Sequence, residues 1–190
     1  IGAISGPGNL VKDGGGLLKF SGTDANTYAG STIVNRGKLE LGKSGAVAVP
    51  GPLTCEGLGT SSGVRLMLAN QISDSSHVQL NGSTYLDLNG NSDTIGSIAG
   101  TGSVLLGTGT LTTGGNNVSS SLAGSILGSG GITKTGTGTF SLTALNSYTG
   151  TTTVNGGTLL VFGQQPSSPV SINTGGTLGG TGKVGNISDL

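Results

Sequence analysis

Short runs in which apolar and β-branched residues alternate with polar ones recur along this chain, and glycine separates them. The clearest example is the stretch 131–161, which holds runs at 132–134, 139–143 and 151–161. A period of two is typical of β-strands that bury one face. The longest run without glycine, 64–81, also alternates and does not follow a helical period of 3.6. The pattern predicts many short strands and essentially no α-helix.

The same order of runs occurs twice, once near residues 9–42 and once near 126–161. From Asn26 and Asn146 onward the two copies align without gaps. The matching positions are Asn26, Tyr28, Gly30, Thr32, Val34, Asn35, Gly37, Leu39 and Leu41 in the first copy and Asn146, Tyr148, Gly150, Thr152, Val154, Asn155, Gly157, Leu159 and Val161 in the second. Self-similarity of this kind predicts a repeat protein.

Strands of three to five residues between glycine or Asn-Gly corners favour a β-solenoid, because these residues accept left-handed backbone angles. Tyr148 follows Tyr28 by 120 residues, which predicts six coils of roughly 20 residues between the copies. On that period the chain forms a parallel β-helix of about nine coils, stacked about 4.8 Å apart. A β-sandwich is the alternative. No linker or change in composition divides the chain, so residues 1–190 are expected to form a single β-helix domain.

Composition supports an ordered, glycine-turned β protein. The chain contains 40 glycines and only 8% charged residues, with a net charge of zero, so it lacks the high net charge of disordered chains. The eight Lys and Arg residues are scattered and form no basic block, which argues against nucleic acid as a partner. No signal peptide, membrane-spanning run or lipidation motif is visible, and the first residue is Ile1. We therefore expect a fragment or processed product of a larger protein.

Three motif matches lack the partners that their chemistry needs. Gly59 to Gly63 fits G-x-S-x-G with Ser61 as nucleophile, but no helix is predicted after it. Gly180 to Gly185 fits a dinucleotide fingerprint without the βαβ unit, and is expected to be a turn. His77 is the only histidine and is expected in a solvated loop, and the lone Cys55 is expected to be buried.

Carboxylates are the more serious candidates, because β-helical folds can carry glycan-cleaving sites with two or three acids on one face. Asp74, Asp87 and Asp93 form the only local concentration. Asp87 alternates with leucines and is expected to face solvent, and Asp93 follows Asn91-Ser92 and is expected in a turn. The favoured interpretation is that no residue is catalytic, binds a cofactor or ligates a metal.

Tyr28 and Tyr148 could be platforms for sugar rings, but their identical placement after an asparagine favours a structural role at the corner of a coil. The threonine-rich runs at 108–113 and 151–153 could form hydroxyl ladders. These runs are short and interrupted, which does not favour regular hydroxyl ladders.

Two segments carry a family resemblance. The run from Lys134 to Leu142, followed by the run from Asn146 to Leu159, resembles the autotransporter-associated β-strand repeat, also called the passenger-associated transport repeat. The copy at 9–42 matches more loosely, with Arg36 where Gly156 stands in the second copy. The resemblance implies a right-handed, single-stranded parallel β-helix exported to a bacterial cell surface, in a protein whose catalytic activity, if any, lies in separate domains.

We therefore expect a structural, non-enzymatic stalk or fibre segment on the cell surface. It needs no cofactor, does not itself enter the membrane, and can associate with itself end to end through its exposed strand edges. The alternatives are an adhesin that binds host or biofilm glycans through a polar face, and a polysaccharide lyase or hydrolase that uses Asp74, Asp87 and Asp93.

Overall fold

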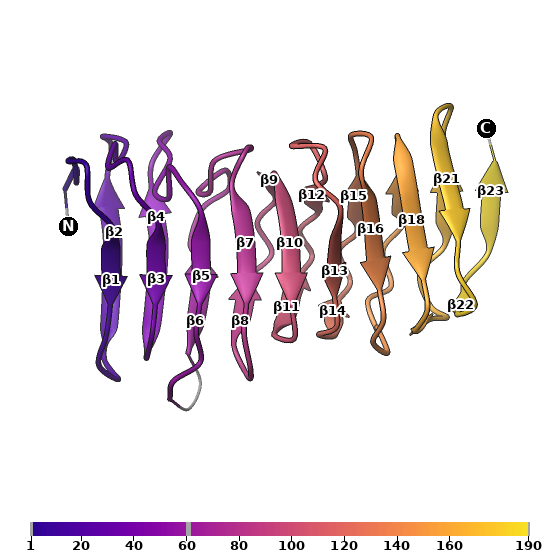
Figure 1. The fold of residues 1–190 in the computed structure, drawn as a ribbon, viewed down its shortest axis with the longest axis horizontal. Coiled ribbons are helices and arrows are strands. Elements are labelled where there is room, and N and C mark those ends of the chain that lie inside the picture. Colours follow the sequence, from indigo (N-terminus) through magenta and orange to yellow (C-terminus); the bar gives the residue numbers. More distant parts are fainter. Residues whose placement is uncertain (1, 60–61, 190) are drawn as a thin grey trace.

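The computed structural model of the chain describes residues 2–59 and 62–189, and it shows an elongated stack of β-coils with the two termini at opposite ends (Figure 1). The described residues are all strand, turn and irregular structure, and every strand pairing between them is parallel. Nothing in these ranges is a helix that could span a membrane. The predicted β-solenoid of about nine coils is confirmed.

One sheet runs the full length of the stack and receives one strand from each coil. We call it the long sheet. Its nine strands are, in order, β1 (Leu10–Lys12), β3 (Thr32–Val34), β5 (Leu53–Cys55), β7 (His77–Leu80), β10 (Ser97–Gly100), β13 (Ser120–Leu122), β16 (Thr139–Leu142), β18 (Gly157–Val161) and β21 (Gly176–Gly179).

The other two faces are each formed by a shorter sheet. The N-terminal sheet contains β2 (Leu17–Gly22), β4 (Lys38–Lys43), β6 (Gly63–Leu66), β8 (Tyr85–Asp87), β11 (Ser103–Gly107) and β14 (Ile126–Gly128). The C-terminal sheet contains β9 (Asp93–Ile95), β12 (Leu111–Thr113), β15 (Ile132–Lys134), β17 (Thr152–Val154), β20 (Val170–Ile172) and β23 (Ile187–Asp189). A pair formed by β19 (Gln164–Gln165) and β22 (Lys183–Val184) follows the N-terminal sheet towards the C-terminus.

The coils vary in length around the expected value. Paired residues in the long sheet are 25 positions apart at Leu53 and Val78, and 19 positions apart at Phe140 and Leu159. The longer coils lie in the N-terminal half, where turns and bends are inserted between the strands. Most added residues lie between the strands, so the backbone pairing between coils continues; within β11 the pairing with β14 shifts register between Leu105 and Gly107.

This variation corrects the expected spacing of the two repeat copies. The matching strands β3 and β17 lie in different sheets. Five steps in the long sheet lead from β3 to β16, and β17 then lies on a further face of that coil. The copies are therefore separated by more than five but fewer than six coils, because the coils average more than the assumed 20 residues. The same motif is built on different faces of the solenoid.

The core is a column of apolar, mostly aliphatic side chains that fills the centre of the stack. Every second strand residue points inward, as the alternation in the sequence predicts. The column contains, among others, Val34, Leu39, Leu53, Val64, Val78, Leu86, Ile98, Val104, Leu122, Phe140, Leu159 and Val170. Each coil contributes its residues on top of the previous set, so hydrophobic burial and backbone pairing stabilise the same contact between coils.

Glycine is required at corners for two distinct reasons. Gly82 and Gly90 have φ angles of 57° and 81°, and Asn89 has a φ of 52°, which confirms both Asn-Gly turns. At Gly124 the reason is contact between coils, because a Cβ there would lie 1.7 Å from the carbonyl oxygen of Gly102. The backbones of neighbouring coils touch at this corner and leave no room for a side chain.

Candidate functional site

The asparagine of each repeat copy joins neighbouring coils. Asn26 accepts a hydrogen bond from the amide of Ile4 at 2.9 Å and donates to the carbonyl of Ala48 at 2.7 Å, so its side chain spans three successive coils. In the second copy, Asn146 accepts from the amide of Ile126, also at 2.9 Å. Both side chains are buried, so they satisfy backbone groups that no strand partner reaches.

The tyrosine of each copy is buried beneath the same corner. The hydroxyl of Tyr28 bonds with that of Thr32, and the hydroxyl of Tyr148 bonds with that of Thr152 and donates to Gln165 at 3.1 Å. Burial raises the pKa of both phenols. Because the rings are enclosed, they are not platforms for a ligand, as their matched placement in the sequence predicts.

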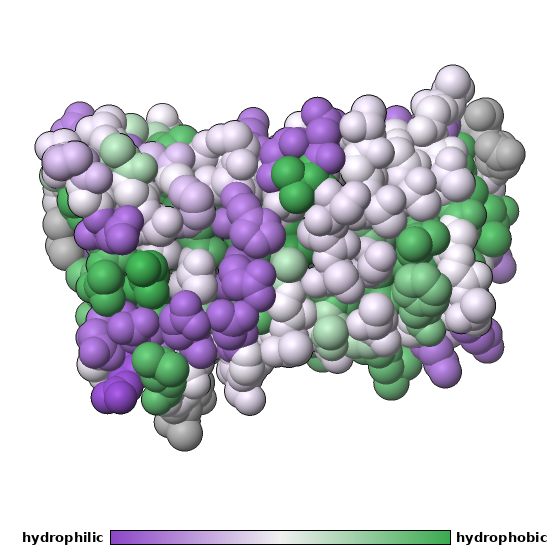
Figure 2. All heavy atoms as spheres, in the orientation of Figure 1, coloured by the Kyte–Doolittle hydropathy of each residue, from purple (hydrophilic) through white to green (hydrophobic). Residues whose placement is uncertain are grey.

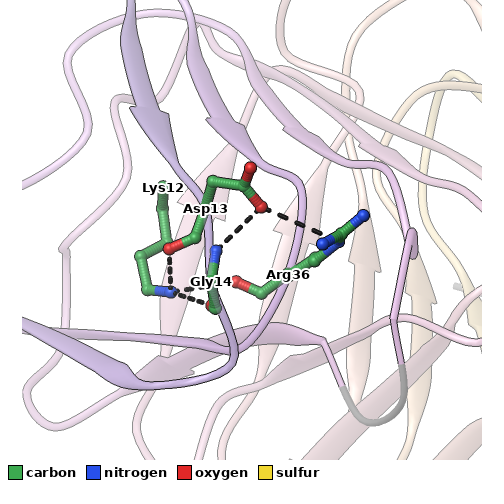
Figure 3. A network of polar contacts seen from close by, with 4 residues as sticks. All are labelled: Lys12, Asp13, Gly14 and Arg36. Carbon is green, nitrogen blue, oxygen red and sulfur yellow. Dashed lines mark hydrogen bonds and ion pairs between the residues drawn. The ribbon is translucent and has the colours of Figure 1, made fainter.

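A buried lysine closes the corner on the other side of each copy (Figure 3). The ammonium of Lys12 donates to the carbonyls of Asp13 at 3.0 Å and Gly14 at 2.6 Å, and to the carbonyl of Arg36 in the next coil at 3.0 Å. The carboxylate of Asp13 accepts from the amide of Gly14 and lies 3.8 Å from the guanidinium of Arg36. We call this arrangement the lysine clasp.

The second copy builds the same clasp. Lys134 donates to the carbonyls of Thr135 at 2.6 Å, Gly136 at 3.1 Å and Gly156 of the next coil at 3.1 Å. Its ammonium is buried and has no carboxylate partner among the residues that the structure describes, and desolvation lowers its pKa. Charge-assisted bonds to carbonyl dipoles take the place of hydration.

The clasp was not predicted from the sequence, in which the eight Lys and Arg residues are scattered and form no basic block. A signal was present in the alternation. Lys12 lies two residues after Leu10, and Lys134 lies two residues after Ile132, so each lysine shares the inward side of its strand with an apolar residue.

A second buried polar group lies where the C-terminal sheet begins. The side chain of Gln71 accepts from the amide of Lys43 at 2.8 Å and donates to its carbonyl at 2.9 Å. One oxygen of Asp93 accepts from the amides of Gln71 and Ile72, at 2.8 and 3.3 Å. The other oxygen is buried without a hydrogen-bond partner. Burial raises the pKa of Asp93 to about 6.

The structure does not place all three candidate acids on one face, although Asp74 lies near enough to Asp93 to add to the rise in its pKa. Asp87 faces outward from β8 and forms an ion pair with Arg65 at 3.1 Å, as its alternation with leucines predicts. Asp74 is exposed at a corner. The prediction that Asp93 lies in a turn is wrong, because it is the first residue of β9 and its carboxylate turns inward to bind two backbone amides.

The remaining motif matches are placed as follows. His77 lies on β7 and not in a loop, and its Nδ1 is 2.8 Å from the hydroxyl of Ser97. Cys55 is buried, and burial, with a smaller contribution from Glu56, raises its pKa to about 12. Ser61 of the G-x-S-x-G match lies outside the described residues. Gly180 has a φ of 110°, which places a turn at the start of the dinucleotide-like match.

A hydroxyl ladder does form along the C-terminal sheet, against expectation. Its outward residues pair in register from coil to coil: Thr94, Thr112, Thr133, Thr153, Ser171 and Ser188. The sequence analysis looked for long runs of threonine along the chain. In a solenoid the ladder takes only one residue from each coil. Whether a ladder forms therefore depends on the number of residues between successive coils.

Comparison with known proteins places these corners in a family. The family model described as Passenger-associated-transport-repeat matches residues 10–41 and 132–161, which contain both clasps and both tyrosine corners. The chain carries passenger-associated transport repeats. It contains two such repeats, and each includes the lysine, asparagine and tyrosine described above.

Two known proteins resemble parts of this chain. The adhesin BmaC autotransporter of Brucella suis biovar 1 (strain 1330) is 38% identical over 99 residues, covering 47% of this chain and 3% of that protein. The extracellular serine protease of Serratia marcescens is 48% identical over 60 residues, covering 32% of this chain and 6% of that protein. The match thus covers only a small part of either relative. No solved structure matches the chain.

The lysine clasp predicts a large stability loss on substitution. Lys134→Met keeps the aliphatic stem but leaves the carbonyls of Thr135, Gly136 and Gly156 without their donor. We expect the free energy of unfolding to fall by about 3 kcal/mol, measured by urea denaturation. The matched control is Lys183→Met at an exposed position, which should change it by less than about 0.5 kcal/mol. Equal losses in the two variants would refute the clasp.

Asp93 predicts an unusual dependence of stability on pH. Its pKa is about 6 in the folded chain and 3.8 in the reference state, so the folded state holds more protons between these values. The free energy of unfolding therefore rises as pH falls. The increase is about 1 kcal/mol from pH 8 to pH 5 and about 3 kcal/mol once the pH is below both pKa values. Asp93→Asn should remove this rise, whereas Asp24→Asn, at an exposed position, should keep it. Urea denaturation of all three proteins across this range provides the test.

Proposed function

We propose that this chain is a structural, non-enzymatic stalk segment that folds outside the bacterial cell and spaces other parts of its passenger. The observation that supports it best is the long sheet, which takes one parallel strand from every coil and is followed throughout by a continuous core. Such a stack resists bending because each coil is fixed to its neighbours by both backbone pairing and packing.

The polar side chains of the repeat also favour a structural role. Lys134, Asn146 and Tyr148 use their polar atoms on groups of their own or the adjacent coils. The described acids Asp87 and Asp93 lie on different faces. The two relatives are an adhesin and a protease by name, which fits a common β-helical support that carries different activities elsewhere.

Deleting a whole coil tests the stalk role. Gly100 pairs with Leu122, so removing residues 100–121 places Leu122 where Gly100 stood and restores the stacking. We expect this variant to fold, with an unchanged β circular dichroism spectrum and a rod about 4.8 Å shorter by small-angle scattering. Removing residues 100–110 leaves the faces out of register and should abolish folding. Loss of structure in both variants would count against a modular stalk.

We also propose that the stalk can associate end to end. The strand β1 pairs only with β3 among the described strands, so its other edge is open. The amide of Leu10 donates to Ser31, and the carbonyl of Lys12 accepts from Asn35, so both residues bond towards β3. By alternation, the backbone groups of Val11 point to the open edge, where a parallel strand of a second copy could pair.

A proline at this position tests the association. Val11→Pro removes the outward amide without removing a bond to β3, and the valine side chain is 55% exposed, so folding should survive. The wild-type chain should increase in mass with concentration in light scattering, and the proline variant should remain monomeric. The matched control Val11→Thr keeps the amide and should associate like the wild type. A wild-type chain that is monomeric at all concentrations would overturn this proposal.

A further inference from the structure

Exposed charge is concentrated in the N-terminal coils of the solenoid, and Lys183 near the C-terminus is an exception. Between Asp93 and Lys183 the only charged residue is Lys134, and it is buried. On the face shown in Figure 2, hydrophilic residues gather over the N-terminal coils, and the C-terminal coils are mostly neutral or apolar. The charged side chains of this chain are therefore concentrated on a few N-terminal coils. Their arrangement on those coils can indicate a binding surface.

On the N-terminal sheet these charges alternate in sign from coil to coil. Lys19, Glu40, Arg65 and Asp87 pair in register along the sheet. Lys19 and Glu40 approach to 3.9 Å, and Arg65 and Asp87 to 3.1 Å. The row carries no net charge, so it presents donors and acceptors side by side without attracting ions of one sign.

A groove of about 300 Å³ opens beside this row, a volume at the lower end of small-molecule sites. Its lining residues are Lys38, Glu40, Arg65, Tyr85, Asp87 and Leu105. Two cations face two anions, and an aromatic ring and one leucine supply the apolar surface. The groove therefore suits a neutral molecule that has both hydroxyl groups and an apolar face.

Tyr85 differs from the other two tyrosines of the chain. Tyr28 and Tyr148 are buried with their hydroxyls bonded, whereas Tyr85 lines the groove and its hydroxyl has no hydrogen bond among the described residues. Its ring covers Gly63 on the adjacent strand, where a Cβ would lie 2.8 Å from both Cδ1 and Cδ2. The missing side chain at residue 63 lets the ring rest against the sheet.

We propose that this groove binds a neutral saccharide, with a sugar ring stacked on Tyr85 and its hydroxyls bonded by the Arg65–Asp87 pair and by Lys38 and Glu40. Sugar rings have an apolar face of C–H groups that packs on aromatic rings, and hydroxyls that need both donors and acceptors. A peptide is less suited, because the groove has no deep apolar pocket for a side chain. This binding role is separate from the stalk role and does not depend on it.

The three tyrosines provide the readout, since the chain contains no tryptophan. The folded chain, with its tyrosine rings isotopically labelled, is titrated with cellotetraose, maltotetraose and chitotetraose and followed by NMR. We expect at least one of these to shift the Tyr85 signals saturably, with a Kd of about 1 mM, and to leave the signals of Tyr28 and Tyr148 unchanged. Because the ligand is neutral, the Kd should change less than about twofold on adding about 0.5 M NaCl.

Variants then assign the site. Tyr85→Leu should abolish binding, and Tyr85→Phe, which keeps the ring, should weaken it less than about threefold. The double variant Arg65→Gln/Asp87→Asn, which keeps hydrogen-bonding groups but removes the ion pair, should weaken binding about tenfold. Phe162→Leu removes an exposed aromatic outside the groove and should have no effect. Unfolding curves confirm that each variant is folded.

Three results would overturn the proposal. The first is no shift with any of the three saccharides up to about 20 mM. The second is binding that survives both Tyr85→Leu and the double variant. The third is binding to a charged peptide, lost in salt, where the saccharides do not bind. None of these results bears on coil deletion or end-to-end association, so failure here leaves the stalk proposal intact.

Discussion

The structure depends on the need to satisfy backbone groups at the corners, where the chain leaves one face and enters the next. On the faces, parallel pairing between coils meets that need without help from side chains. At the repeat corners, the carbonyls of Asp13 and Gly14, and those of Thr135 and Gly136, accept from a lysine ammonium. In the repeats, a buried ammonium meets that need, since Lys12 and Lys134 each donate to two carbonyls of their own coil and one of the next. A charge is therefore buried because it replaces several missing donors at once.

The repeat motif specifies a corner, and the solenoid uses that corner on two different faces. In the first copy the lysine strand β1 belongs to the long sheet, and in the second copy the equivalent strand β15 belongs to the C-terminal sheet. The contacts of Lys12 and Lys134 are nevertheless equivalent. Local contacts between two successive coils thus determine how the motif folds. Its position around the cross-section of the solenoid does not change those contacts. Insertions that lengthen a coil shift the next copy to another face without disturbing it.

Much of the fold could be predicted from the sequence, because alternation and glycine spacing report directly on strands and corners. The buried Tyr148 and the turn at Asn89 follow from local pattern. The lysine clasp and the inward carboxylate of Asp93 could not be predicted in this way, because a charged side chain is expected at the surface. Their burial is explained only by the unpaired carbonyls or amides of the folded corner that they bind. The hydroxyl ladder from Thr94 to Ser188 can be predicted only from the register between coils. That register depends on the true length of each coil.

The same cross-coil contacts suggest how such a chain assembles. Lys12 completes its bonds only when Arg36 of the next coil is in place, and Asn26 needs both Ile4 before it and Ala48 after it. A coil at the end of a growing stack therefore has unsatisfied groups that the next coil satisfies, so each folded coil lowers the cost of ordering its neighbour. At corners such as Gly124, the absence of a side chain allows the next coil to stack this closely. Folding that spreads from coil to coil suits a chain that emerges gradually, because the finished part offers an edge and the emerging part supplies the next strand.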